Sequence, residues 1–173
     1  MSDFRILTGL VAVSPQIGTA DIDEAAEAGV TLIINNRPDG EEVGQPTNDE
    51  LKAYAESKGI KWAHIPVAGG ALSFEPVGQM AECIFKADGP ILAFCRSGTR
   101  SCTLWALAQN LSDDYSVEGI IGAASDVGYD LSHMASTLED LRQQQVGPNT
   151  DGDGNSDGNT GGNPGGDTGT GQD

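Results

Sequence analysis

The stretch from Pro90 to Asn110 restricts the fold more than any other part of the sequence. It places a short apolar run, residues 91–94, directly before Cys95, and an apolar-periodic segment after Arg100. A run of this length is typical of a buried strand, and the periodic segment predicts a helix. A strand, a tight polar loop and a helix in this order direct several backbone N–H groups toward one point. In this chain that point is the sulfur of Cys95.

The loop also has the composition of a site that activates a thiol. After the cysteine it carries two arginines, a glycine and two hydroxyl residues in consecutive positions: Arg96, Ser97, Gly98, Thr99 and Arg100. A thiol at a helix N-terminus beside arginines generally has a lowered pKa, and the thiolate is the nucleophilic form. Glycine allows the tight turn where a Cβ would clash. We expect Arg100 to bind an oxyanion or a transferred group, and Ser101 to donate to the sulfur from the first helical turn.

We therefore predict Cys95 and Arg100 as catalytic residues. The predicted anion-binding residues lie in the same loop, at the start of the following helix and in an earlier loop: Arg96, Ser97, Gly98, Thr99, Ser101, Arg37 and Asp39. The alternative is that Cys95 is an inert cysteine at the end of a buried strand and that the arginines are solvated. A cysteine, a glycine and two arginines within six residues favour the active-site interpretation.

The earlier loop, residues 35–46, follows another buried apolar run and contains Arg37 and Asp39. One interpretation is a second anion clamp, in which Asp39 or Glu41 holds Arg37. The other is a surface turn organised by the Pro-Asp-Gly sequence at residues 38–40. Both interpretations stay open at this point.

The order of the elements predicts an α/β fold. Apolar runs predict strands near residues 10–13, 30–34, 60–67 and 91–94. Helices are expected at 19–28, from Thr47 to just before Gly59, at 75–86, after Arg100 as far as Leu111, and at 116–124 and 131–144. Thr19 is the expected N-cap of the first helix, and Thr47 with Glu50 forms a capping box for the second. Alternating strands and helices favour a single domain with a mostly parallel sheet flanked by helices, whose site lies beyond the carboxyl ends of the strands.

The domain is predicted to cover residues 1–146, followed by an acidic tail rich in Gly, Asp and Asn at 147–173, which we expect to be disordered. The net charge is −17, and the tail contributes five aspartates and no base, which leaves twelve excess negative charges for residues 1–146. This excess repels nucleic acid and anionic membranes, so we expect neither as a partner. The predicted partner is a small anionic substrate, either a phosphoester or thiosulfate or a persulfide.

The remaining features predict a cytoplasmic protein without a metal or a cofactor. Three cysteines do not suggest a disulfide framework, and a reducing compartment suits a working thiol. No run approaches the ~20 apolar residues of a membrane span, and the first fifteen residues do not have the pattern of a signal peptide. No cluster has metal-ligand spacing. The oligomeric state does not follow from the sequence.

Four segments resemble the phosphatase-like domain of the beta-lactamase-hydrolase-like proteins: INNRPDGEE at residues 34–42, QP at 45–46, HIPVAGG at 64–70 and FCRSGTRS at 94–101. The layout is also similar to that of dual-specificity protein phosphatases. The resemblance extends from Leu10 to about Leu111. It implies a cysteine-phosphatase-like fold and a thiolate-dependent enzyme.

Two departures from true cysteine phosphatases affect the predicted activity. Cys95 and Arg100 enclose four residues, where those enzymes have five, and the loop instead resembles that of single-domain rhodanese sulfurtransferases. Cysteine phosphatases carry an aspartic acid on the loop after the IPV-type strand, but residues 68–73 contain no carboxylate. Sulfur transfer from thiosulfate needs no such acid, since sulfite leaves as a stable anion. The sequence therefore favours a rhodanese-type sulfurtransferase with a Cys95 persulfide. Phosphomonoester hydrolysis through phospho-Cys95 is the alternative, and a non-catalytic anion- or persulfide-binding module is a third.

Overall fold

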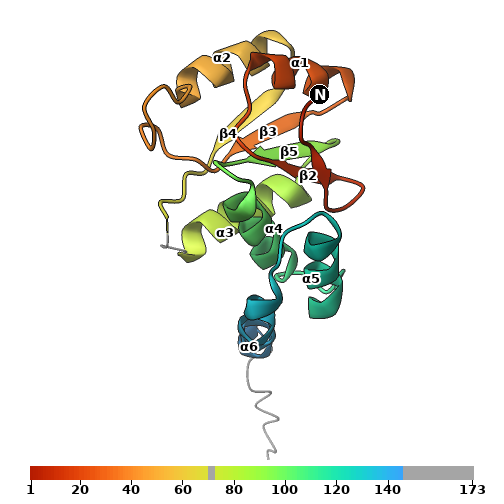
Figure 1. Ribbon diagram of the computed structural model, residues 1–173. Helices are drawn as coiled ribbons and strands as arrows, with labels where there is room; N and C mark the ends of the chain where they lie inside the picture. The colour runs from red at the N-terminus through yellow and green to blue at the C-terminus, as the bar shows by residue number, and fades with distance from the viewer. Residues whose placement is uncertain (70–72, 146–173) are drawn as a thin grey trace, which may run out of the picture.

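The computed structural model describes residues 1–69 and 73–145, and within them the chain forms one α/β domain (Figure 1). Its five strands form one sheet in the order β1-β2-β5-β3-β4. Their bounds are β1 Arg5–Ile6, β2 Val11–Ser14, β3 Leu32–Asn35, β4 Lys61–His64 and β5 Ile91–Phe94. Strands β2, β5, β3 and β4 run parallel, whereas β1 pairs with β2 in the antiparallel direction. The predicted α/β fold with a mostly parallel sheet is confirmed.

Helices cover both faces of the sheet (Figure 1). One face carries α1, Thr19–Glu27, and α2, Asn48–Ser57. The other carries α3, Phe74–Phe85, and α4, Thr99–Gln109, with α5, Val117–Asp126, and α6, Ala135–Gln145, packed beyond α4. A short 3₁₀ turn, Ser132–Met134, precedes α6. Each face has its own hydrophobic cluster, and Ile91 to Phe94 contribute alternately to the two because β5 is buried on both sides.

The helix caps agree with the sequence at α2 and differ at α1. Thr47 Oγ1 accepts from the Glu50 N–H at 3.3 Å, and the Glu50 carboxylate accepts from the Thr47 N–H at 3.0 Å. The predicted capping box is therefore confirmed. At α1 the N-cap is Gly18, not Thr19, because the Asp21 carboxylate accepts from the Gly18 N–H at 2.8 Å. That bond closes the first turn one residue earlier than expected.

Three further expectations were inaccurate. The two-residue strand β1 was not predicted, since a pair of residues carries no periodicity. The apolar residues of the sequence at 75–86 include Phe85, which we expected on the buried face of that helix, but it is 52% exposed at the end of α3. The predicted helix at 131–144 is divided, because residues 132–134 form the 3₁₀ turn before α6 begins.

The register of the sheet brings three strand ends together at the candidate site. Phe94, the last residue of β5, is aligned with Ser14 of β2 on one side and with Asn35 of β3 on the other. Cys95 therefore begins its loop at the centre of the carboxyl edge. The predicted tail at 147–173 lies outside the described residues, so the domain boundary stays a prediction. Within the described residues, no helix combines the length and the apolar character needed to cross a membrane.

Candidate active site

The loop from Cys95 to Arg100 connects β5 to α4 and curls around the cysteine sulfur. Cys95 Sγ accepts a hydrogen bond from the Gly98 N–H at 3.1 Å. Gly98 is the N-cap of α4 and has φ = +89°, a conformation that side-chain-bearing residues rarely adopt. Cys95 is fully buried, but its sulfur faces a backbone donor and the charged Arg100. Cys95 is therefore not surrounded by hydrocarbon alone, and its catalytic role stays a prediction.

Arg100 lies beside the sulfur and is held from two directions. Its Nη1 and Nη2 donate to the two carboxylate oxygens of Glu41 at 2.7 and 2.8 Å, and Nη1 also donates to the Val67 carbonyl at 2.7 Å. Hydrogen bonding to Glu41 raises the pKa of Arg100. The guanidinium therefore has a fixed position at the rim of the loop.

Glu41 contacts the candidate site, although the sequence analysis named it only as a possible partner of Arg37. Besides Arg100 it accepts from Arg37 Nε at 2.9 Å. Hydrogen bonding to Arg100, reinforced by Arg37, lowers the pKa of Glu41 to about 2. The carboxylate therefore stays ionised at neutral pH and orients Arg100. Its signals in the sequence were its place in the INNRPDGEE segment and its position four residues after Arg37.

Arg37 is buried, and its guanidinium is used inside the protein. Nε donates to Glu41, Nη1 donates to the Gln16 side-chain oxygen at 2.9 Å, and Nη2 donates to Glu42 at 2.8 Å. The expectation that Asp39 or Glu41 holds Arg37 is met by Glu41. These contacts make Arg37 a support for the two glutamates, and a role in direct anion binding stays a prediction.

Asp39 has a contact of a different kind. Its carboxylate accepts from the backbone N–H of Asn48 at 2.7 Å, at the first residue of α2. Asn48 in turn accepts from the Asn35 side chain at 3.1 Å. Asp39 therefore ties the loop after β3 to the start of α2, and the structure does not place it beside Arg100.

Three predicted anion-binding residues lie at the exposed surface of the loop. Arg96 is exposed and donates to Glu42 at 2.7 Å. Ser97 and Thr99 are also exposed, with their hydroxyls 3.1 Å apart. Their role in anion binding stays a prediction.

Ser101 does not donate to the sulfur, contrary to expectation. It is buried, and its hydroxyl donates to Asn36 Oδ1 at 2.7 Å. The Asn36 amide nitrogen donates onward to the Ile65 carbonyl at 3.1 Å. Ser101 therefore joins the first turn of α4 to the ends of β3 and β4, which fixes the loop from behind.

The described carboxylates next to the loop are both paired. Glu41 is held by Arg100 and Arg37, and hydrogen bonding to Arg37 with the charge of Arg96 lowers the pKa of Glu42. Neither is set up to donate a proton at neutral pH. Burial raises the pKa of Cys102 to about 12 and raises that of Cys83.

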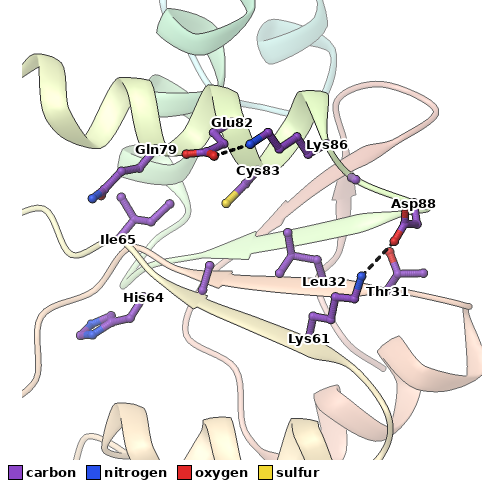
Figure 2. A pocket seen from close by; sticks show the side chains of 12 residues that line it. Thr31, Leu32, Lys61, His64, Ile65, Gln79, Glu82, Cys83, Lys86 and Asp88 are labelled. Atoms are coloured by element: carbon purple, nitrogen blue, oxygen red, sulfur yellow. Dashed lines mark hydrogen bonds and ion pairs between the residues drawn. The ribbon is translucent and has the colours of Figure 1, made fainter.

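A groove of about 410 Å³ lies elsewhere, between α3 and the strands β3 and β4. Figure 2 shows the side chains that line it. Its lining includes Lys61, paired with Asp88 at 2.9 Å, and Lys86, paired with Glu82 at 2.6 Å. Its lining residues do not include those of the Cys95 loop, so we do not assign it to the catalytic site. Within residues 1–69 and 73–145, no three His, Cys, Asp or Glu side chains are grouped to hold a metal ion.

Comparison with known proteins gives a match over most of the described chain. A family model described as the phosphatase-like domain of beta-lactamase hydrolase-like protein matches residues 3–112. The chain is 34% identical over 139 residues to the beta-lactamase hydrolase-like protein of Agrobacterium fabrum, covering 80% of this chain and 31% of that protein. A Xylella fastidiosa protein of the same description is 32% identical over 129 residues, covering 75% and 30%. The chain thus spans about a third of the length of these relatives.

Solved structures agree on the fold. A candidate phosphatase from Neisseria meningitidis is 31% identical with a TM-score of 0.72, covering 82% of this chain and all of the other. Tk-PTP in its active form is 19% identical with a TM-score of 0.62, covering 83% and 97%. The Siw14 catalytic core is 16% identical with a TM-score of 0.61, covering 83% and 89%. The last two similarities concern the fold alone, and that fold is the cysteine-phosphatase type expected from the sequence.

Proposed function

Because the chain belongs to the phosphatase-like domain family of the beta-lactamase hydrolase-like proteins, we propose that it hydrolyses small phosphomonoesters through a phospho-Cys95 intermediate. Family membership confirms the resemblance to this family that the sequence predicted. It also confirms the prediction of a cysteine-dependent, phosphatase-like enzyme. Sulfur transfer, which the sequence favoured, has no support in the comparisons, and the alternative of phosphate hydrolysis fits them better.

One observation carries the proposal: the sulfur of Cys95 receives the Gly98 N–H and lies beside a guanidinium held in place by Glu41. Hydrogen bonds and a neighbouring positive charge both favour the thiolate. Backbone N–H groups at the start of α4 and Arg100 would bind the oxygens of a phosphoryl group next to the sulfur. Arg96, Ser97 and Thr99 would contact the same anion from the exposed side of the loop.

The reaction proceeds in two displacements. The Cys95 thiolate attacks phosphorus, so an S–P bond forms, the P–O bond to the leaving group breaks, and the leaving oxygen departs with the electron pair. Water then attacks the phosphorus of phospho-Cys95, which releases inorganic phosphate and a proton and returns the thiolate. Arg100 stabilises the negative charge on the phosphoryl oxygens in both steps.

The carboxylates next to the loop restrict the substrate. Glu41 and Glu42 stay ionised beside their arginines, so neither supplies a proton to the leaving oxygen. General acid assistance is worth about 10²–10⁴ in rate. We therefore propose substrates whose leaving group is stable without a proton, such as aryl phosphates, in preference to alkyl phosphates.

That Glu41 and Glu42 do not donate a proton also favours sulfur transfer as a second candidate. In that reaction the Cys95 thiolate attacks the outer sulfur of thiosulfate, an S–S bond forms, and sulfite leaves with the electron pair of the broken bond. A nucleophile such as cyanide then takes the outer sulfur from the persulfide and returns the thiolate. No step needs a protonated leaving group, and the six-residue loop CRSGTR is the feature that the sequence shares with rhodanese-type loops.

The test is a pair of assays on the same preparations. Wild type, Cys95→Ser and the control Cys83→Ser are assayed for phosphate release from an aryl phosphate and for thiocyanate formation from thiosulfate and cyanide. The proposal expects phosphate release by wild type and Cys83→Ser and its loss in Cys95→Ser. Thiocyanate formation that depends on Cys95, without phosphate release, would establish the second candidate instead. Anion binding without turnover in either assay would leave a non-catalytic binding module.

A further inference from the structure

Tyr129 lies beyond the segment that the family model matches, yet its side chain reaches the active loop. It follows α5, where its backbone N–H donates to the Ala124 carbonyl at 2.9 Å after the turn at Gly128. The residue is buried, with 6% of its surface exposed. Its hydroxyl donates to the Ser97 carbonyl at 3.1 Å. A residue from the C-terminal part of the described chain, 32 positions after Ser97, thus contacts the centre of the loop.

The ring of Tyr129 is held in place from its other side. The Arg5 guanidinium lies over it, with its carbon 4.8 Å from the ring centroid. Arg5 is itself paired with Asp3 at 2.8 Å and donates to the Val127 carbonyl at 3.5 Å. A cation over an aromatic face is attractive and restricts the position of the ring. The hydroxyl is therefore presented to the loop by a ring that is restrained.

The contact acts on the peptide that binds the sulfur. The Ser97 carbonyl and the Gly98 N–H belong to one planar trans peptide group, so they point in opposite directions. Tyr129 holds the carbonyl end at 3.1 Å, and the sulfur of Cys95 accepts from the N–H end at 3.1 Å. Fixing the oxygen toward Tyr129 turns the hydrogen toward the sulfur.

The space at Gly98 supports the same arrangement independently. A Cβ built there would overlap the Tyr129 hydroxyl and approach the ring carbon that bears it to 2.8 Å. The close approach of Tyr129 therefore requires the glycine that the left-handed turn also requires. The two residues form a matched pair across the loop.

The geometry points to Tyr129 as a positioning residue that orients the Ser97–Gly98 peptide toward the sulfur of Cys95, an inference that rests on the proposed nucleophilic role of Cys95. The Tyr129 hydroxyl contacts the carbonyl end of this peptide. It acts through the peptide group. When the Ser97 carbonyl accepts a hydrogen bond, the Gly98 N–H of the same peptide becomes more polar, and its hydrogen bond to the thiolate becomes stronger. Loss of the hydroxyl releases the peptide to rotate, and the sulfur loses a donor that favours its ionised form.

The test compares Tyr129→Phe with Tyr115→Phe, a control that removes the hydroxyl of a partly exposed tyrosine. Because Cys95 is buried, the rate of its reaction with iodoacetamide at neutral pH is measured relative to its plateau rate at high pH, which removes the effect of access, and each cysteine is followed by peptide mass spectrometry. We expect labelling of Cys95 to slow about three- to tenfold in Tyr129→Phe, the value of one hydrogen bond. The kcat for an aryl phosphate should fall by a similar factor, with KM little changed.

Equal Cys95 labelling and equal kcat in the two variants would overturn the inference. Labelling of the buried Cys102 in Tyr129→Phe would also overturn it, since that result assigns the hydroxyl to folding and not to positioning. The labelling readout does not depend on turnover. A slower Cys95 in Tyr129→Phe, with no phosphatase activity in wild type, would therefore support the positioning role while rejecting the proposed function.

Discussion

Arg100 is held in place by Glu41, a residue 59 positions earlier in the chain. Two hydrogen bonds to one carboxylate fix the plane of the guanidinium as well as its position. Arg37 supports Glu41 from behind with a bond of 2.9 Å. The orientation of the proposed catalytic residue Arg100 therefore depends on two successive ion pairs, from the buried Arg37 to Glu41 and from Glu41 to Arg100.

Replacement of Glu41 by Gln is expected to lower kcat/KM for an aryl phosphate about ten- to hundredfold, the range found when a positioning contact is lost. The amide offers one acceptor oxygen instead of two, so Arg100 loses half of its bidentate contact. Steady-state kinetics measure the effect. The control is Glu42→Gln, which alters a carboxylate paired with Arg96 and Arg37 but not with Arg100. Equal losses in both variants would show that the net charge of the loop matters and the orientation of Arg100 does not.

Gly98 gives a second prediction at this scale. Gly98→Ala is expected to destabilise the domain more than Gly40→Ala, although both glycines have positive φ, +89° and +75°. Backbone strain of about 1 kcal/mol applies to both, but a Cβ at position 98 meets Tyr129 and one at position 40 meets open space. Urea unfolding monitored by fluorescence gives the two free energies. If the two variants were equally stable, the close contact at Tyr129 would have no energetic consequence.

Site residues that are close together in the sequence could be predicted, and those that are far apart in the sequence could not. Cys95, Gly98 and Arg100 lie within six residues, so their spacing alone indicated a loop around a sulfur. Glu41 and Tyr129 reach that loop from 59 and 32 positions away, and no periodicity links them to it. Ser101 was predicted to face the sulfur because it is near in sequence, but the helical turn directs its hydroxyl to Asn36. Local spacing indicates the nucleophile, whereas its supports depend on tertiary packing.

At the scale of elements, strands β3 and β5 were predicted well because both are short apolar runs buried on two faces. Helix α2 was predicted from a capping box, a signal contained within four residues. The predicted start of α1 was wrong by one residue. The Asp21 carboxylate accepts from the Gly18 N–H, and the sequence alone did not favour Gly18 over Thr19 as the N-cap. Strand β1 forms only through its pairing with β2, a contact that the pattern of two residues does not contain.

The cap of α2 provides a prediction for this scale. Thr47→Ala is expected to lower the free energy of unfolding by about 1 kcal/mol, since it removes one N-cap hydrogen bond. Thermal unfolding followed by circular dichroism measures the change. Ser57→Ala is the matched control: its hydroxyl donates to the Tyr54 carbonyl at the other end of the same helix, where no N–H group is left unpaired by its loss. A larger loss in the control than in Thr47→Ala would exclude the capping box as the main stabilising contact of the helix ends.

At the scale of the whole molecule, the ion pairs that organise the site also couple folding to pH. Most of the lowered carboxyl pKa values belong to exposed groups, among them Asp23, Glu82 and Asp88, whose pairs with lysine are screened by water. Glu41 differs because its arginine partners are partly or fully buried, and Arg100 lowers its pKa from 4.5 to about 2. Its contribution to acid stability should therefore be separable from the others.

Ionised Glu41 stabilises the folded protein, so lowering the pH should reduce the free energy of unfolding. Because the pKa of Glu41 is lower in the folded protein than in the unfolded chain, its ionised form stabilises the fold fully above pH 4.5. That stabilisation is lost progressively as pH falls from about 4.5 toward 2, where the folded protein must also protonate Glu41. Urea unfolding at a series of pH values from 6 to 2.5 should give a shallower loss of stability in Glu41→Gln than in wild type. Glu82→Gln, at an exposed pair with Lys86, should keep nearly the wild-type slope. Parallel slopes for wild type and Glu41→Gln would mean that the carboxylate gains nothing from Arg100 and Arg37, and the support proposed for the catalytic arginine would then have no energetic basis.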